Sequence, residues 1–473
     1  MKSNSHRSSY NKHLLHPWAN LPELGDDDSS SVIVQAEGVY IYDDEGNKLL
    51  DGPAGMWCMQ TGYGRKEIAE AVAAQIMQLG YSTPFSTIND KEVELAARIA
   101  AKTPGDLNRI FFTTCGSTAV DSALRLCQLA NNIKGQKQRK HIISRDDAYH
   151  GSTFLAASIT GKERDKTAMD TLTDTVHFLT SPCYFNNPQF TSEQLFCDFL
   201  VDELKNKIEE IGSENVMCFI AEPILASGGV IVPPAGYNKR CWKLVKSYGI
   251  TYIADEVVTG FGRLGHWFAS EEVFGVVPDI ITFAKGVTSG YIPMGGYAVS
   301  DRFMAEISGD NAKGCSYSNG YTWSGSPVAC AAALASWDII EGEGLLEHVQ
   351  EIAPYFQQQL RTLEDIPLVG EVRGIGLMAA IEMTVPAELQ IKGQSAEGSL
   401  SQSELLEKDY ALGDAVDAHC QQLGLIVRPM IHICVMSPPL IISKTQIDDL
   451  VSALRKGIEL TYADIQEKGV SSD

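Results

Sequence analysis

The sequence GITYIADEVVTGFGRLG occupies residues 249–265, and PDIITFAKG follows after a spacer at residues 278–286. Each stretch contains a run of five residues, at 250–254 and at 280–284, that is mostly apolar and rich in β-branched or aromatic side chains. Short apolar runs bounded by turn residues are typical of strands that are buried on both faces, as in a parallel sheet. The two stretches therefore predict two strands of an α/β protein.

Both runs lead into ionisable residues, the first at Asp255 and the second at Lys285. Ligands of open α/β sheets bind at the carboxyl ends of the strands, so we expect these two side chains to meet there. One explanation is a buried ion pair with no ligand. The other is a site for pyridoxal phosphate, whose aldehyde forms a Schiff base with a lysine amine and whose pyridine nitrogen needs an acidic partner.

The residues ADEVVTGFGRLG, followed by FAKG, resemble the signature of the class III aminotransferases, a pyridoxal-phosphate-dependent family of fold type I. The resemblance implies an α/β fold in which a large domain with a mainly parallel, seven-stranded sheet is joined to a smaller α/β domain. It also implies that Lys285 holds the aldehyde of the cofactor and carries protons. Asp255 is then expected to keep the pyridine nitrogen protonated.

A chain of 473 residues can build one large and one small domain, each with its own core. Its hydrophobic content of 44% and charged content of 21% are ordinary for a globular protein. We expect four segments: a flexible leader at 1–31, the N-terminal part of the small domain at 32–60, the large cofactor-binding domain at 61–343, and the C-terminal part of the small domain at 344–473.

Acidic residues outnumber basic ones, 60 against 38, which gives a formal net charge of −22. This charge argues against binding to nucleic acid or to an anionic membrane, and the sequence has no apolar signal core and no apolar span of about twenty residues. The eleven cysteines include no Cys-x-x-Cys pair, and the histidines show no metal-ligand spacing. We therefore expect a cytoplasmic protein with reduced thiols and no bound metal.

Two further segments have a clear periodic pattern. Residues 32–51 alternate around a turn at 44–46 and predict the strands of a hairpin. Apolar residues at helical spacing predict a helix over 66–79 whose stripe packs on the core. The stripe consists of Ile68, Val72, Ile76 and Leu79.

A predicted strand at 109–114 leads into Cys115, Gly116, Ser117 and Thr118, which open a predicted helix. Free backbone N–H groups at such a helix start favour an anion, but serine and threonine are also good caps without any ligand. From the residues alone, both explanations stay open. The resemblance implies that Gly116, Ser117 and Thr118 bind the cofactor phosphate. Relatives usually have an acidic residue where Thr118 stands, which should matter little because backbone amides make most of the contact.

The resemblance assigns further residues to the cofactor. The aromatic ring of Tyr149, in the tripeptide Tyr-His-Gly, is expected to lie on the cofactor ring, and Val257 is expected to pack against the opposite face. Glu222 matches an acidic residue near the cofactor, where we expect it to position other groups. We expect His150 to be a hydrogen-bonded loop residue and not the general base, since Lys285 already serves that role.

Two residues are expected to act across a subunit boundary. Thr322 matches a threonine that, in relatives, holds the phosphate of the neighbouring subunit, although a simple helix cap would also explain it. Phe85, in the loop 82–87, matches a segment that reaches the active site of the partner. Both imply a homodimer with shared active sites, alone or as a dimer of dimers. Ser326 replaces the His or Asn that is more common in relatives, so this helix start can pack differently.

The donor and acceptor pocket is expected to involve Trp57, Tyr149, Phe85 and Arg428. Trp57 lies on a loop with glycines at positions 52, 55, 62 and 64 and is expected to form a wall of the pocket, the alternative being a core residue. A guanidinium binds a carboxylate in a bidentate manner, so Arg428 is the expected clamp for a keto acid, the alternative being a surface salt bridge. In amine:pyruvate-type relatives the equivalent arginine swings out for amines that lack a carboxylate.

These residues predict an aminotransferase that moves an amino group from an ω-amino acid or amine to a keto acid such as pyruvate in a ping-pong reaction. Two alternatives remain at this point. One is a decarboxylase or racemase on the same fold, and the other is a binding protein that has kept the fold without activity. The sequence does not rank the donors, because the size of the pocket depends on packing.

Overall fold

The computed structural model describes residues 13–18, 21, 31–386 and 402–468. The largest sheet is made of β4 (Arg109–Thr113), β5 (His141–Arg145), β6 (Val176–Leu179), β7 (Val216–Ala221), β8 (Thr251–Asp255), β9 (Ile280–Phe283) and β10 (Gly295–Val299). The strand order is β4-β10-β9-β8-β7-β5-β6. Strand β10 is antiparallel to both neighbours, and all other adjacent pairs are parallel. The predicted mainly parallel, seven-stranded sheet is confirmed.

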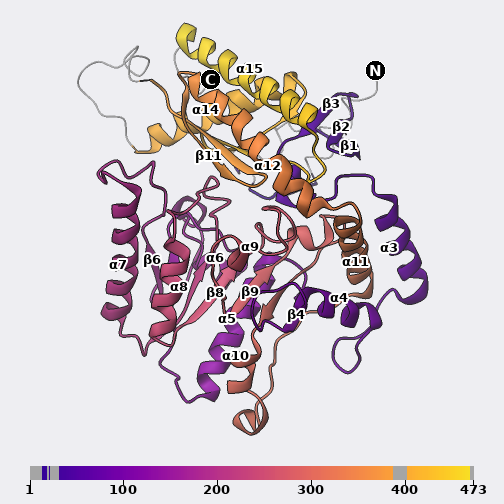
Figure 1. Cartoon of the computed structure of the whole chain (residues 1–473), viewed down its shortest axis with the longest axis vertical. Helices are drawn as coiled ribbons and strands as arrows, with labels where there is room; N and C mark the ends of the chain where they lie inside the picture. The colour runs from indigo at the N-terminus through magenta and orange to yellow at the C-terminus, as the bar shows by residue number, and fades with distance from the viewer. Residues whose placement is uncertain (1–12, 19–20, 22–30, 387–401, 469–473) are drawn as a thin grey trace.

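Helices cover both faces of this sheet (Figure 1). On one face, Cys218 and Ile220 of β7 share an apolar cluster with α5 (Gly116–Ile133). On the other face, Phe219 packs in the cluster of α7 (Glu193–Ile211) and α8 (Tyr237–Ser247). Because successive residues of a strand point to opposite faces, burial of both faces requires an unbroken apolar run.

The two strands at the centre of the sheet carry the ionisable residues that the sequence singled out. Strands β8 and β9 are parallel, and Asp255 lies opposite Thr282 in the register. Asp255 is the last residue of β8, and Lys285 begins the short helix η3 (Lys285–Thr288) just after β9. Both residues therefore lie at the carboxyl edge of the sheet.

Two smaller sheets combine strands from both ends of the chain. One contains β1 (Ile33–Glu37), β2 (Tyr40–Asp43), β3 (Lys48–Asp51) and β13 (Leu425–Ile426), and the other contains β11 (Val369–Ile375), β12 (Met378–Met383), β14 (Arg428–Met430) and β15 (Ile433–Met436). Strand β3 pairs with β13, which brings the N-terminal strands next to the C-terminal part of the chain (Figure 1). Helices α12 (Leu345–Arg361), α14 (Gln402–Gln422) and α15 (Lys444–Lys468) accompany these sheets. The predicted leader, residues 1–31, lies largely outside the described residues.

Helix α3 (Lys66–Leu79) has the predicted bounds, but half of its apolar stripe does not pack on the core. Ile68 is fully buried, whereas Ile76 and Leu79 are 55% and 37% exposed. The helix packs on α11 (Pro327–Gly342) at the edge of the molecule (Figure 1), and the second half of the stripe stays partly uncovered by the residues that the structure describes. The prediction that all four stripe residues face the core is therefore wrong.

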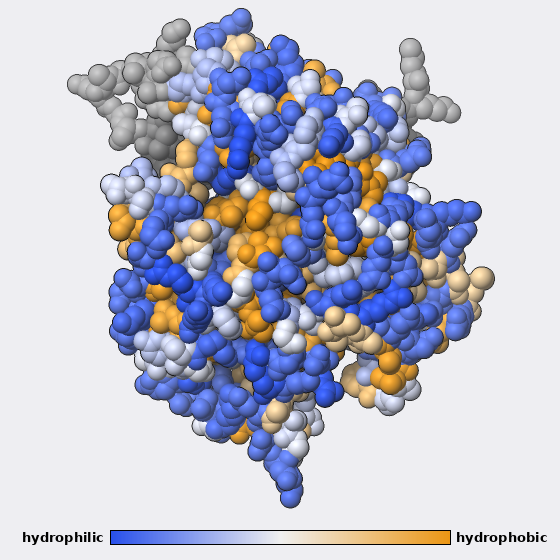
Figure 2. All heavy atoms as spheres, in the orientation of Figure 1, coloured by the Kyte–Doolittle hydropathy of each residue, from blue (hydrophilic) through white to orange (hydrophobic). Residues whose placement is uncertain are grey.

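The surface seen in Figure 2 is mainly hydrophilic, and apolar residues gather near the middle of this face. Within the ranges given above, no helix is both long and apolar enough to cross a membrane. In the same ranges, no three His, Cys, Asp or Glu side chains come together in a group that could hold a metal ion.

Candidate active site

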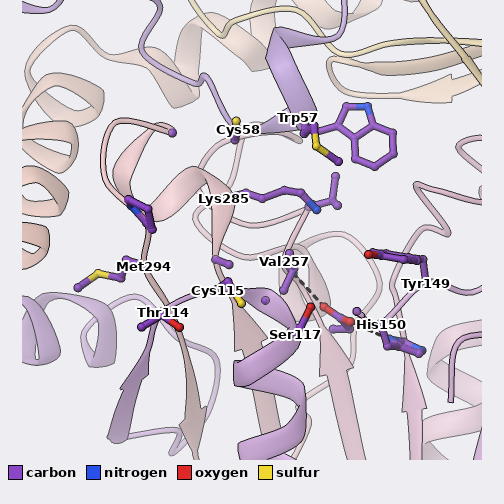
Figure 3. A pocket seen from close by; sticks show the side chains of 18 of the residues that line it. Trp57, Cys58, Thr114, Cys115, Ser117, Tyr149, His150, Val257, Lys285 and Met294 are labelled. Carbon is purple, nitrogen blue, oxygen red and sulfur yellow. Dashed lines mark hydrogen bonds and ion pairs between the residues drawn. The ribbon is translucent and has the colours of Figure 1, made fainter. Parts of the chain in front are cut away.

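A cavity of about 490 Å³ opens at the carboxyl ends of the parallel strands. Its wall includes Trp57, Ser117, Tyr149, Asp255, Val257 and Lys285. Figure 3 shows Lys285 reaching across the cavity below Trp57, with Ser117 at the start of α5 and Tyr149 at one side. Six residues that the sequence singled out thus share one cavity, although they come from distant parts of the chain.

Asp255 presents a buried carboxylate that three donors hold in place. Its Oδ1 accepts hydrogen bonds from the Thr282 hydroxyl at 3.1 Å and from the Val257 backbone N–H at 3.2 Å. Its Oδ2 accepts a hydrogen bond from Nδ1 of His150 at 2.7 Å. The side chain is only 4% exposed, so its orientation is fixed before any ligand binds.

Lys285 lines the same cavity as this carboxylate and has a left-handed backbone conformation, with φ of 40°. A non-glycine residue with such a φ is strained, and strain of this kind concentrates at functional sites. Burial lowers the pKa of the Lys285 amine, although the charges of Asp255 and Glu222 oppose this effect. A lowered pKa raises the fraction of neutral amine, which is the form that attacks a carbonyl.

The start of α5 forms a close-fitting backbone cradle. A Cβ on Gly116 would lie 3.1 Å from a methyl group of Val257, and a Cβ on Gly151 would lie 2.5 Å from the Ser117 hydroxyl oxygen. Ser117 also accepts a hydrogen bond from the Ser152 backbone N–H at 3.0 Å. The helix has 18 residues, so its free N–H groups and its dipole favour an anion at this end.

Thr118 lies in this helix start, but its side chain belongs to the cap and not to the cavity wall. Its hydroxyl accepts a hydrogen bond from the Cys115 backbone N–H at 3.1 Å, which closes a capping box. A glutamate at this position closes the same kind of box. Thr118 therefore caps the start of this helix, although it differs from the residue usual in the family.

Glu222 connects two loops of the cavity. Its carboxylate accepts hydrogen bonds from the backbone N–H groups of Tyr149 at 2.9 Å and Ala226 at 3.1 Å. Burial raises the pKa of Glu222, while the nearby His150 opposes the rise. This arrangement supports a positioning role, in which Glu222 fixes the loop that carries Tyr149.

The partner of His150 was not predicted from the sequence. Its Nδ1 bonds Asp255, while its Nε2 is buried and has no hydrogen-bond partner in the part of the chain that the structure describes. No local sequence signal links two residues 105 positions apart. The structure therefore places His150 with Thr282 and Val257 among the groups that position Asp255.

Arg428 stacks on Trp57. Its Cζ lies 5.0 Å from the centroid of the indole ring, and the Lys285 Nζ lies 5.4 Å from the same centroid. Trp57 is only 2% exposed and has φ of 59°. Over the described ranges, no carboxylate forms an ion pair with Arg428, so the alternative of a surface salt bridge finds no partner.

Two predicted contacts lie away from the cavity of their own chain. Phe85 is 95% exposed. Thr322 is also exposed, in the turn before α11, and Ser326 is the residue that precedes the first turn of this helix. Phe85 and Thr322 do not contribute to the cavity wall described above.

The cavity suits pyridoxal phosphate. It offers a fixed carboxylate for a pyridine nitrogen, a lysine amine with a lowered pKa for an aldehyde, and a glycine-lined helix start for a phosphate. The pyridine nitrogen, the aldehyde and the phosphate of the cofactor thus each have a complementary group in the wall. A doubly covered, mainly parallel sheet with this lysine and aspartate at its carboxyl edge defines a pyridoxal-phosphate enzyme of fold type I.

Comparison with known proteins gives the family. The model of the family aminotransferase class-III matches residues 24–458. The chain belongs to the class III aminotransferases, and it is a pyridoxal-phosphate-dependent transaminase. The expected fold, cofactor and class of reaction are confirmed.

Several relatives are similar over nearly the whole chain. The putrescine–pyruvate aminotransferase of Pseudomonas aeruginosa is 39% identical over 453 residues, which cover 95% of each chain. Gamma-aminobutyrate transaminase 1 of Oryza sativa subsp. indica, a mitochondrial protein, is 34% identical over 92% of this chain and 82% of its own. The crystal structure of an (S)-enantioselective ω-transaminase from Thermomicrobium roseum has 36% identity and a TM-score of 0.89, and the match covers 98% of this chain and 99% of the other.

The contact between His150 and Asp255 leads to a prediction. A hydrogen bond to a charged group contributes about 1.5–3 kcal/mol, so His150→Ala should slow the amine half-reaction about ten- to a hundredfold in single-turnover experiments. His150→Asn can place an amide N–H near the position of Nδ1 and should recover most of this loss. Equal losses in both variants would contradict the positioning role.

Proposed function

We propose that this transaminase transfers an amino group from an ω-amine or an ω-amino acid to pyruvate in two alternating half-reactions. The observation that carries the proposal is Arg428, stacked on Trp57 beside Lys285. A guanidinium at this place can clamp the carboxylate of a keto acid. The similarity to a putrescine–pyruvate aminotransferase and to ω-transaminases supports the same choice of substrates.

Bound pyridoxal phosphate supplies an aldehyde that takes up the amino group and a pyridine ring that withdraws electrons. Asp255, fixed by its three donors, holds a proton on the pyridine nitrogen. The Lys285 amine takes a proton from the donor carbon and delivers it to the carbon of the former aldehyde. Tyr149 and Val257 line the cavity where they would confine the two faces of the ring, and the start of α5 would hold the phosphate.

One cavity serves both half-reactions, so donor and acceptor must use it in turn. We propose that Arg428 binds the carboxylate of pyruvate and rests on Trp57 when an amine without a carboxylate occupies the cavity. Burial lowers the pKa of Arg428, yet a guanidinium stays charged throughout the working range of pH. The clamp is therefore always ready to receive an anion.

This role of Arg428 can be tested with a carboxylate-free donor. Arg428→Ala should raise the KM for pyruvate about ten- to a hundredfold, because a charged hydrogen bond to the carboxylate is lost. The KM for 1-phenylethylamine should change much less. Arg428→Lys should lie between the two, since an ammonium keeps the charge but not the bidentate geometry. An equal increase of KM for pyruvate and for 1-phenylethylamine in Arg428→Ala would contradict the role of Arg428 as a carboxylate clamp.

The proposed function as a whole is tested by a panel of amines incubated with pyruvate, followed by measurement of alanine. A transaminase stops after one turnover when the keto acid is omitted. Continued turnover of the amine without pyruvate would point instead to a decarboxylase or racemase. A panel in which no amine yields alanine would contradict pyruvate as the acceptor.

We also propose a homodimer in which Thr322 and Phe85 complete the active site of the partner. Both side chains are exposed in the single chain, and apolar residues close to Phe85 in the sequence are exposed as well: Ile76 at 55%, Met77 at 84% and Ile88 at 77%. An apolar surface of this kind needs cover. Sedimentation of the holoenzyme should give a dimer or a multiple of it, and a stable, fully active monomer would contradict the proposal.

We propose the division into domains and the location of the protein on similar grounds. The two small sheets take their strands from 33–51 and 369–436, and the large sheet takes its strands from 109–299, which supports a small domain at 32–60 and 344–473 around a large domain at 61–343. All eleven cysteines are free thiols, which supports a reducing compartment such as the cytoplasm. Limited proteolysis and cell fractionation would test these two statements.

A further inference from the structure

Lys162 is a nearly buried lysine outside the set of residues that the cofactor uses. It lies between α6 (Phe154–Ser158) and the short helix η2 (Glu163–Asp165) and is only 8% exposed. Its ammonium donates hydrogen bonds to the hydroxyl of Ser227, at 2.7 Å, and to the backbone oxygen of the same residue. Both acceptors are neutral. Throughout the described ranges, no carboxylate forms an ion pair with Lys162, so the cation has no direct counter-ion.

This ammonium lies directly behind the wall of the active site. Ser227, which accepts its hydrogen bonds, lines the cavity. The Lys162 Nζ is also 5.9 Å from the centroid of the Tyr149 ring, and Tyr149 lines the cavity as well. Arg428 is a second cation near the cavity, since it stacks on Trp57, which lines the wall. A donor in this cavity therefore approaches two positive charges.

The charge of Lys162 is poised to change within the working range of pH. Burial, helped by the neighbouring charge of Arg164, lowers the pKa of Lys162 to about 8, while the charges of Asp165, Glu222 and Asp147 act in the opposite direction. Lys162 is therefore charged below about pH 8 and neutral above it. Arg428 keeps its charge over the whole range.

We propose that Lys162 is a specificity-determining residue whose charge disfavours donors with a second positive charge and favours donors with a negative one. The inference rests on the proposed function, because it concerns the amine that enters the same cavity. A charge behind a thin protein wall acts through a medium of low effective dielectric constant, so it is felt by the far end of a bound donor. Diamines are therefore repelled while Lys162 is charged.

We expect putrescine and 4-aminobutyrate to show opposite pH trends when each is compared with butylamine, a donor of the same carbon number. Butylamine has a neutral tail, putrescine a cationic tail and 4-aminobutyrate an anionic tail. With pyruvate as acceptor, we expect kcat/KM for putrescine relative to butylamine to rise about tenfold between pH 6.5 and pH 8.5, because two charges about 10 Å apart interact by roughly this factor. The ratio for 4-aminobutyrate relative to butylamine should fall over the same range. Each ratio cancels the pH dependence that the donors share.

Two variants separate charge from structure. Lys162→Arg keeps a permanent charge, so its putrescine ratio should stay low and flat with pH. Lys162→Gln keeps a hydrogen-bond donor for Ser227 without the charge, so its putrescine ratio should be high and flat. If Lys162 had only a structural role, each variant would change kcat/KM for putrescine and for butylamine by the same factor.

A second measurement does not depend on turnover. Competitive acetylation of the holoenzyme at different pH values, read by peptide mass, should show Lys162 becoming reactive near pH 8. A wild-type putrescine ratio that is flat, or that changes equally in Lys162→Arg, would overturn the inference while leaving the transaminase intact. Loss of all amine-to-pyruvate turnover in the wild type would contradict the proposed function instead.

Discussion

Replacing Lys285 with alanine should abolish transamination, with a fall in kcat of about 10⁴-fold or more. Lys285 has two tasks that need a primary amine at the same place: it bonds the aldehyde covalently, and it carries a proton between two carbons. Its lowered pKa and its place in the same cavity wall as Asp255 suit both tasks. The rate of the amine half-reaction, followed by the visible absorbance of the cofactor, measures the effect.

Two comparisons make this result specific. Lys285→Arg keeps a positive charge but offers no amine for the aldehyde, so it should be as inactive as Lys285→Ala. Lys162→Gln removes the other buried amine near the cavity and should still catalyse the reaction with butylamine. A fall of less than about tenfold in Lys285→Ala would be too small for a residue that provides acid–base catalysis.

Asp255→Asn should give the second largest effect, a fall in kcat of about a thousandfold. The change is nearly isosteric but removes the negative charge that holds a proton on the pyridine nitrogen. It also disturbs the three hydrogen bonds that the carboxylate accepts from His150, Thr282 and Val257. A bound pyridine ring that is not protonated would withdraw electrons from the donor carbon less strongly.

Asp279 provides a matched control for Asp255. It is also a buried aspartate, 3% exposed. It directly precedes β9, at the opposite end of the strand from Lys285, and does not line the cavity. Its carboxylate forms an ion pair with Lys246 at 2.8 Å. Asp279→Asn should lower thermal stability and leave kcat of the folded enzyme nearly unchanged. Equal losses of kcat in both variants would mean that Asp255 acts through the fold and not on the ring.

The sequence was informative where chemistry and local pattern coincide. The apolar runs at 250–254 and 280–284 appear as β8 and β9, and the residues that follow them meet in one cavity. A strand buried on both faces has a distinctive composition, and its carboxyl end fixes where its next residues go. The helix start at Gly116, which follows another strand of the same sheet, also lines this cavity.

Other features depend on packing between distant segments, which no local pattern encodes. Ile76 and Leu79 belong to a regular apolar stripe, but the stripe does not reveal whether its own chain covers it. Lys162 stands in a charged stretch that resembles surface, yet it is buried against Ser227, 65 positions away. The contact of His150 with Asp255 was missed for the same reason.

We propose that Lys285 bonds the cofactor, although another buried amine, that of Lys162, lies close to the same cavity. The most direct test is reduction of the holoenzyme with borohydride, followed by digestion and peptide mass mapping. We expect the mass of the reduced cofactor on the peptide that contains Lys285 and on no other. The same mass on the peptide that contains Lys162, or on any other lysine, would contradict it.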